Sequence, residues 1–240
     1  SMSQQSQMND LEQGLDTMVL PLFPLRLVLF PGQVLPLHIF EPRYRLMINQ
    51  CIEEERPFGV VLMRDDTPDW RTYSGDVELP CPVGTTAHIR RLERLDDGRL
   101  NIITLGLHRF RVRKLRFDMP YLQGEVDAFP LAGVAAPDDT GAVNRLLRRY
   151  IKVLSQVLNS DIDLEEMPQD PQSLAYLAAG ALQIPWDEKQ QLLETPDLPQ
   201  LLTIERAMLG KETMMLGFMH GSESRVEEQV LGPTGYLYPN

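Results

Sequence analysis

The chain has 240 residues, of which 43% are hydrophobic and 24% charged, and its formal net charge is −11. These values are typical of a globular protein with a substantial core, and they exclude a fibrous or largely disordered chain. No apolar run approaches the roughly 20 residues that a membrane-spanning helix needs, and no signal peptide is visible at the start. We therefore expect a protein with no membrane segment.

The first part of the chain is predicted to be rich in β structure. Residues 1–17 are polar and Gln-rich, and we expect a disordered tail there. Residues 18–29 are apolar but contain two prolines, which confines them to an edge or bulged strand. A Pro31-Gly32 turn leads into a second strand at residues 34–40.

One amphipathic helix is predicted after this strand. Pro42 suits the first turn of a helix. Apolar residues then recur at three- and four-residue spacing: Tyr44, Met47, Ile48, Cys51 and Ile52. A short apolar run at residues 58–63 indicates a buried strand, and residues 65–82 are typical of a long surface loop.

Further strand-like runs follow at residues 85–95, 100–105, 108–117 and 121–129. The first two are joined by Asp97-Gly98, a strong hairpin signal. In the third run, Lys114 breaks the alternation of apolar and polar side chains, which predicts a β-bulge.

The pattern becomes helical from about residue 138. Helices are predicted at residues 138–158, 171–182, 187–193 and 198–219, and residues 221–240 are expected to be extended. The fold class is therefore α+β, with a β-rich lobe at residues 18–131 and an all-helical lobe at residues 138–220.

An ordered series of motifs resembles the N-terminal domain of Lon proteases. The series runs Leu20-Pro21-Leu22-Phe23-Pro24-Leu25-Arg26, Val28-Leu29-Phe30-Pro31-Gly32, Leu35-Pro36-Leu37, Val83-Gly84-Thr85, Asp97-Gly98 and Gly106-Leu107-His108-Arg109. Each motif consists mostly of prolines, apolar residues and turns, so the order is more specific than any member. The resemblance extends through the helices to about Met219.

This resemblance implies a PUA-like β lobe of about six strands and one helix, followed by a helical bundle. It also implies a bacterial-type, proteolysis-related module that recognises unfolded or tagged protein and peptide segments. The sequence has no GxxxxGK[ST] loop, and we expect a stand-alone form without ATPase or peptidase domains. The expected function is a non-catalytic adaptor in proteolysis or quality control, with a PUA-like nucleic-acid-binding protein as the alternative.

No enzyme or metal motif is visible in the sequence. The four histidines share no ligand spacing with each other or with the two cysteines, so we expect no metal and no cofactor. Cys51 falls on the apolar stripe of its helix, which favours a buried structural thiol. Two cysteines without a CxxC pair fit a reducing compartment, and we expect a cytoplasmic protein.

A basic band lies between two acidic flanks. Nine of the 23 basic residues fall between Arg90 and Arg116. The band could be a solvated or lobe-bridging face, a nucleic-acid surface or a contact for an acidic protein. Because no aromatic side chains interleave on its polar face, the pattern disfavours nucleic acid as a partner.

The candidate binding residues are Phe30, Tyr44, Arg109, Arg111 and Arg113. The three arginines could line a cleft at the junction of the lobes, with Phe30 and Tyr44 as apolar contacts for an extended peptide. Phe30 follows a turn, and the alternative is that it folds back against the sheet. The methionines of the last helix, including Met208, Met214, Met215 and Met219, could form an adaptable binding surface, but core packing is favoured. Oligomeric state is not predicted by any of these patterns.

Overall fold

The computed structural model describes residues 18–63, 80–160 and 167–231, with side chains through residue 219. The predicted disordered tail at residues 1–17 and most of the predicted loop at residues 65–82 lie outside these ranges. Residues 232–240 of the predicted extended tail do so too.

The described chain groups into two compact units. The β unit comprises Ser1–Gly133 together with Gln183–Leu198, and the helical unit comprises Val134–Leu182 and Pro199–Asn240. Residues 183–198 were expected in an all-helical lobe, and that assignment is wrong, because this segment contacts the sheet.

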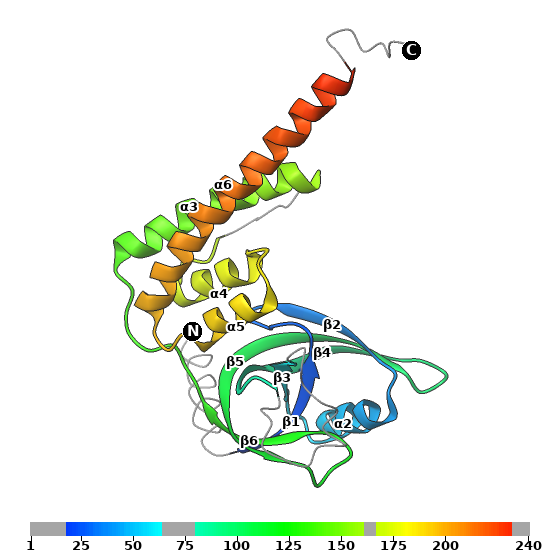
Figure 1. Ribbon diagram of the computed structural model, residues 1–240. Coiled ribbons are helices and arrows are strands. Elements are labelled where there is room, and N and C mark those ends of the chain that lie inside the picture. Colours follow the sequence, from blue (N-terminus) through cyan, green and yellow to red (C-terminus); the bar gives the residue numbers. More distant parts are fainter. Residues whose placement is uncertain (1–17, 64–79, 161–166, 232–240) are drawn as a thin grey trace. The chain divides into compact units, whose positions relative to one another are not determined.

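Six strands and two helices are described in the β unit. They are β1 (Met18–Leu25), β2 (Val34–Ile39), α2 (Pro42–Glu53), β3 (Phe58–Leu62), β4 (Val83–Arg94), β5 (Leu100–Arg116), β6 (Gln123–Ala128) and α5 (Trp186–Glu194). The strand order is β2-β5-β4-β3-β1-β6, and an additional pairing of β5 with β6 closes the sheet (Figure 1). The α+β fold with a six-stranded lobe and one helix inserted among the strands is confirmed.

The 17-residue strand β5 holds the sheet together. Its first half pairs with β2 and β4, and its second half pairs with β4 and β6. The sequence predicted two separate runs here, but the chain continues through Gly106 without a break. The predicted bulge is confirmed as a register shift between Val112 and Lys114 in the pairing with β6.

The prolines of β1 are accommodated by the way this strand pairs. Residues 18–21 pair only with β6, and residues 22–25 pair only with β3. Each half of β1 therefore has one side without a ladder partner, so Pro21 and Pro24 can occupy the strand despite lacking a backbone N–H.

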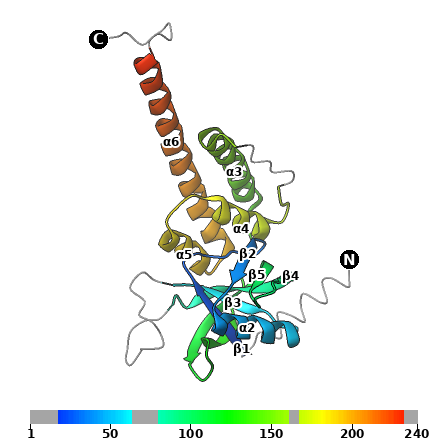
Figure 2. The same cartoon turned by 90° about the vertical axis from the view of Figure 1, so that its right-hand side faces the viewer.

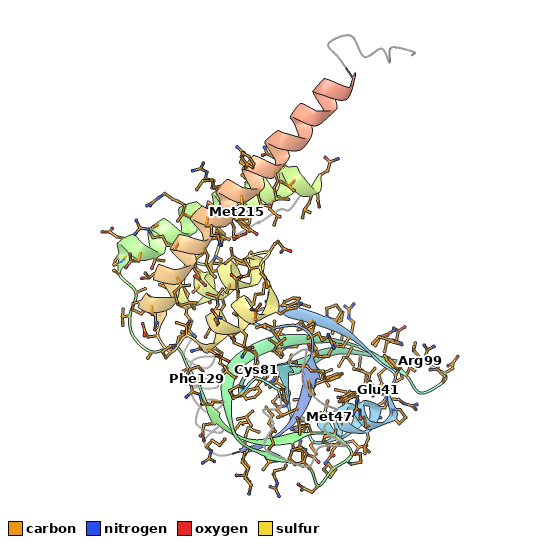
Figure 3. All side chains as sticks on the ribbon, viewed as in Figure 1. Glu41, Met47, Cys81, Arg99, Phe129 and Met215 are labelled. Atoms are coloured by element: carbon orange, nitrogen blue, oxygen red, sulfur yellow. The ribbon has the colours of Figure 1, made fainter. Side chains whose placement is uncertain are left out.

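Two apolar clusters fill the β unit. The larger one joins α2 to the sheet through Met47, Ile48 and Cys51 of the helix, with Phe58 and Ile102 among the strand residues; Figure 3 labels Met47. The second cluster, around Phe110, is formed by Leu20, Leu22, Val61, Leu122 and Val126. Phe110 packs against Gly84, where a Cβ atom would collide with the Val60 carbonyl oxygen.

The helical unit contains α3 (Pro137–Leu158), α4 (Pro171–Ala181) and most of α6 (Leu198–Leu231). Asp138 and Asp139 lie in the first turn of α3, where the helix dipole favours negative charge. Asp170 caps α4 by accepting a hydrogen bond from the Ser173 backbone N–H at 2.8 Å. Helix α6 continues past the end of α3 (Figure 2), so the expectation that residues 221–231 are extended is wrong.

Candidate functional site

Helix α5 is fixed to the sheet by hydrogen bonds from one side chain of the sheet and one side chain of the helix. Nη1 of Arg109 on β5 donates hydrogen bonds to the carbonyl oxygens of Leu193 and Thr195, at 2.6 and 2.7 Å. Nε2 of Gln190 donates to the carbonyl oxygen of Val83, the first residue of β4, at 3.0 Å. A cation at the last carbonyls of a helix also interacts favourably with the helix dipole.

A cavity of about 670 Å³ lies beside α5, and we call it the α5 pocket. This volume is in the range of small-ligand sites in proteins. The ends of β1 and β3 contribute one wall and the helix contributes the other. Its lining residues are Arg26, Leu62, Met63, Cys81, Pro185, Trp186, Asp187, Gln190, Gln191 and Glu194. Figure 3 labels Cys81, which is 5% exposed.

Gln190 combines near-complete burial with an unused acceptor. It is 4% exposed, and its Oε1, which is itself buried, has no hydrogen-bond partner among the described residues. Its Nε2 donates to both the Val83 carbonyl and Oε1 of Glu194, the latter at 2.9 Å. Both of those partners are acceptors, so the amide orientation is determined: exchanging its oxygen and nitrogen would place its single oxygen against two acceptor oxygens.

The side chains around Gln190 are partly apolar and carry charges of both signs. Trp186 is 45% exposed, and Nζ of Lys189 lies 5.2 Å from the centroid of its ring. Burial lowers the pKa of Lys189. Arg26, Asp187 and Glu194 supply one positive and two negative groups to the lining. The lining of the pocket therefore combines apolar surface with charges of both signs.

The sequence did not identify the α5 pocket. Its residues come from segments more than 100 positions apart, and the helix was assigned to the other lobe. The available signal was Trp186, an aromatic residue directly before a predicted helix start at Asp187.

Three of the predicted binding residues are not accessible contacts. Phe30 is fully buried, Arg109 is 3% exposed and Tyr44 is 6% exposed. The expectation that these side chains present themselves to a peptide is therefore wrong, and each has a structural role instead.

The turn after Phe30 is bound to β5, which explains the burial of this residue. Gly32 has a φ of +85°, a conformation that glycine adopts readily, and its N–H donates to the Gly106 carbonyl at 2.8 Å. The Phe30 N–H donates to Oε1 of Gln33 at 2.9 Å. Phe30 thus folds back into the protein, the alternative that the sequence left open.

Tyr44 and Arg109 are buried by other elements. The Tyr44 ring stacks on Phe23 with centroids 4.1 Å apart, within the larger apolar cluster. Arg109 follows the outward-facing period of β5, but α5 covers that position. Its guanidinium also lies 4.5 Å from the ring centroid of Phe129, labelled in Figure 3.

Arg111 and Arg113 are exposed on β5. The guanidinium of Arg111 lies 4.3 Å from the Phe129 ring centroid, and Nε of Arg113 forms an ion pair with Asp127 at 2.9 Å. These two residues remain candidates for a basic contact surface.

The last helix carries a second candidate surface, formed by Met214, Met215, Phe218 and Met219. We call it the methionine surface; its members are between 50% and 77% exposed, and they line a shallow groove of about 290 Å³. Figure 3 labels Met215 on α6. The sequence favoured core packing for these methionines, and that interpretation is wrong, because Met214, Met215 and Met219 are each at least half exposed.

The thiol of Cys51 is not suited to nucleophilic chemistry. Burial raises its pKa to about 11, so the thiolate is scarce at neutral pH. Among the described residues, no three His, Cys, Asp or Glu side chains are placed to hold a metal ion. None of the helices in the described ranges is both long and apolar enough to cross a membrane.

The fold defines an α+β protein: a six-stranded sheet, closed by the pairing of β5 with β6, has one helix inserted among its strands and is followed by a helical unit. Comparisons with known proteins identify the family. A family model described as the ATP-dependent protease La (LON) substrate-binding domain matches residues 19–211. The chain belongs to this family.

Individual relatives agree with this assignment. The chain is 29% identical to a Lon protease of Anaeromyxobacter dehalogenans over 220 residues, which cover 88% of this chain and 25% of the relative. The identity to Lon protease 2 of Myxococcus xanthus is also 29%, over 88% of this chain and 26% of that relative. The chain thus spans about a quarter of the length of these curated relatives.

Two solved structures share the fold. A Lon N-terminal domain protein from Xanthomonas campestris aligns with a TM-score of 0.60 and 25% identity, covering 79% of this chain and 98% of that one. The N-terminal domain of a Mycobacterium avium complex Lon protease also gives a TM-score of 0.60, at 18% identity, and covers 80% of this chain and 98% of that one.

Proposed function

We propose that this chain is a non-catalytic module that binds apolar segments of unfolded protein chains and acts as an adaptor in proteolysis. Membership of a substrate-binding-domain family supports the general role. The observation that carries the proposal is the methionine surface, where four apolar side chains are exposed side by side on one helix.

Methionine suits such a surface because its flexible thioether side chain adapts to partners of different shape. Exposed apolar side chains that cluster, unlike scattered ones, mark interaction sites. The spacing of the four residues, at 214, 215, 218 and 219, places them along one face of α6. Burying them against an apolar segment would release this surface from water without requiring a defined sequence in the partner.

Capture of a permanently unfolded protein tests the proposal. Reduced, carboxymethylated α-lactalbumin should be retained on the immobilised chain, and native α-lactalbumin should not. Phe218→Gln should weaken retention by about tenfold, in line with the roughly 1.5–3 kcal/mol that burying such a side chain contributes.

Leu158→Gln on α3 is the matched control, since Leu158 is 56% exposed but lies outside the methionine surface. Retention should persist at high salt, because apolar contacts are not screened. Equal losses in both variants, or retention that disappears with salt, would contradict the proposal. Steeply salt-dependent binding to RNA would instead favour a nucleic-acid-binding function.

A further inference from the structure

A cavity of about 390 Å³ is lined by the end of α2, the turn after it and the second half of β4. We call it the arginine pocket, because Arg56, Arg90 and Arg91 all contribute to its lining. Its volume lies within the range of small-ligand sites in proteins. All of its lining residues belong to the β unit.

A β-bulge in β4 brings two consecutive arginines to this cavity. Neighbouring positions of β5 pair with Ile89 and Arg91, so Arg90 is the extra residue of the bulge. Consecutive side chains of a regular strand point to opposite faces of the sheet, whereas a bulge changes the direction of a side chain. The bulge therefore explains how Arg90 and Arg91 line the same pocket.

The two arginines of the bulge are exposed, and among the described residues neither one pairs with a carboxylate. Arg56 differs from them, because its Nε forms an ion pair with Glu54 at 2.7 Å. Glu55 contributes a carboxylate to the lining. Positive charge therefore exceeds negative charge around the pocket, and the guanidinium groups of Arg90 and Arg91 are available to an anion.

The rest of the lining is uncharged at neutral pH. Burial lowers the pKa of His88 to about 4, so its ring carries no charge there. Ile52, Pro57, Ile89 and Leu92 add apolar surface to the same cavity. A ligand that matches this lining combines an anionic group with a short apolar group.

A carboxylate fits these surroundings better than a phosphate does. Guanidinium groups bind both anions through charge-assisted hydrogen bonds. A phosphate carries more negative charge, which Glu55 would repel more strongly, and it offers nothing to the apolar lining. An apolar residue at the C-terminus of a protein chain places a carboxylate directly beside its side chain.

We propose that the arginine pocket binds the C-terminal residue of a protein chain, with Arg90 and Arg91 holding the terminal carboxylate and the apolar lining receiving the side chain. The proposal rests on the proposed function in taking a protein chain as the ligand, and it adds a site in the β unit. Because both arginines are exposed, the rest of the bound chain can leave the pocket toward solvent.

Fluorescence anisotropy of a labelled peptide tests this proposal on the full chain. The probe is an octapeptide of glycine and serine that is labelled at its N-terminus and ends in Ala-Leu with a free carboxylate. Amidation of the terminus should weaken binding by about tenfold, because it removes the charge that the arginines bind. An amidated peptide with an internal glutamate should bind as weakly, which distinguishes a chain terminus from an acidic side chain.

Variants of the pocket should change binding of the free-carboxylate probe in opposite directions. Arg90→Gln and Arg91→Gln should each weaken it by about tenfold and leave the amidated peptide unaffected. Glu55→Gln should strengthen it by roughly two- to fivefold, because a like charge is removed. Arg94→Gln is the matched control, since Arg94 is exposed on the same strand but donates to Asn49 and does not line the pocket.

Equal binding of the free and amidated peptides would overturn the proposal, and so would equal losses in Arg91→Gln and Arg94→Gln. Displacement of the probe by inorganic phosphate as readily as by N-acetyl-leucine, at constant ionic strength, would also overturn it. If unfolded α-lactalbumin is captured but the peptides are not discriminated, the pocket proposal fails and the proposed function stands. If the peptides are discriminated but unfolded α-lactalbumin is not captured, the methionine surface fails as the capture site and the pocket proposal stands.

Discussion

Arg109 and Leu193 are 84 residues apart in the sequence, and a hydrogen bond of 2.6 Å joins the Arg109 guanidinium to the Leu193 carbonyl oxygen. This bond connects the middle of β5 to the end of α5. One wall of the α5 pocket is therefore positioned by a residue that does not line it.

Replacing Arg109 by methionine should lower the stability of the β unit by about 2–4 kcal/mol. The change leaves two buried carbonyl oxygens without a donor and removes the contact with Phe129. Urea denaturation followed by circular dichroism measures the loss. Arg111→Met is the control, because Arg111 contacts the same ring from an exposed position, and it should cost less than about 1 kcal/mol. Equal effects would show that the hydrogen bonds to α5 contribute nothing.

Phe30→Ala should lower stability by about 3–5 kcal/mol and leave capture of unfolded α-lactalbumin unchanged per folded molecule. The reason is that Phe30 is fully buried, so truncation creates a cavity. Thermal unfolding and retention assays, performed on the same preparations, check both parts. Phe40→Ala, at a residue that is 60% exposed, should alter neither measurement strongly. Weakened capture with unchanged stability would restore Phe30 as a contact residue.

Glu205→Gln should stabilise the helical unit at pH 8 and have little effect below pH 4.5. Glu205 is fully buried, neither carboxyl oxygen has a hydrogen-bond partner among the described residues, and burial raises its pKa well above the ordinary 4.5. The folded state therefore retains a proton that the unfolded state loses, so stability falls as pH rises above 4.5.

Unfolding midpoints of wild type and Glu205→Gln, measured between pH 4 and pH 8, should diverge as pH increases. Glu212→Gln on the same helix provides the comparison, since its side chain is 20% exposed and pairs with Lys211. Parallel curves for wild type and Glu205→Gln would show that this carboxyl group does not govern the pH dependence.

Two glycine-to-alanine substitutions should change the stability of the protein in opposite directions. Gly84→Ala places a Cβ atom against the Val60 carbonyl and the Phe110 ring, and it should destabilise the protein by about 1–3 kcal/mol. Gly210→Ala on α6 meets nothing within 4 Å and should stabilise it by roughly 0.5–1 kcal/mol, because alanine is the better helix former. Chemical denaturation distinguishes them, and destabilisation at both positions would mean that α6 is not a regular helix at residue 210.

Local patterns were sufficient to predict most of the elements. The period of two identified the strands, and the interruption at Lys114 located the bulge. The same patterns could not say which outward-facing positions another element covers. Arg109 follows the polar period of β5, but α5 covers it from a distant part of the chain.

The candidate site depended on such long-range relationships. An apolar residue after a Pro-Gly turn is buried or exposed according to what the turn binds, and only the contact with Gly106 decides this for Phe30. The methionines of α6 likewise form a periodic pattern whether or not a neighbouring helix covers them. Sequence periodicity predicts which face of a helix is apolar, but it does not identify the element, if any, that covers this face.

The pairing of β5 with β6 limits the number of open strand edges in the β unit. Open edges are templates on which other chains polymerise into aggregates. In the described structure, β2 pairs with β5 along one edge, and its other edge is open. Pro36 within β2 lacks the N–H that an added strand would need. The β unit is thereby protected from recruitment into β-rich aggregates of other chains.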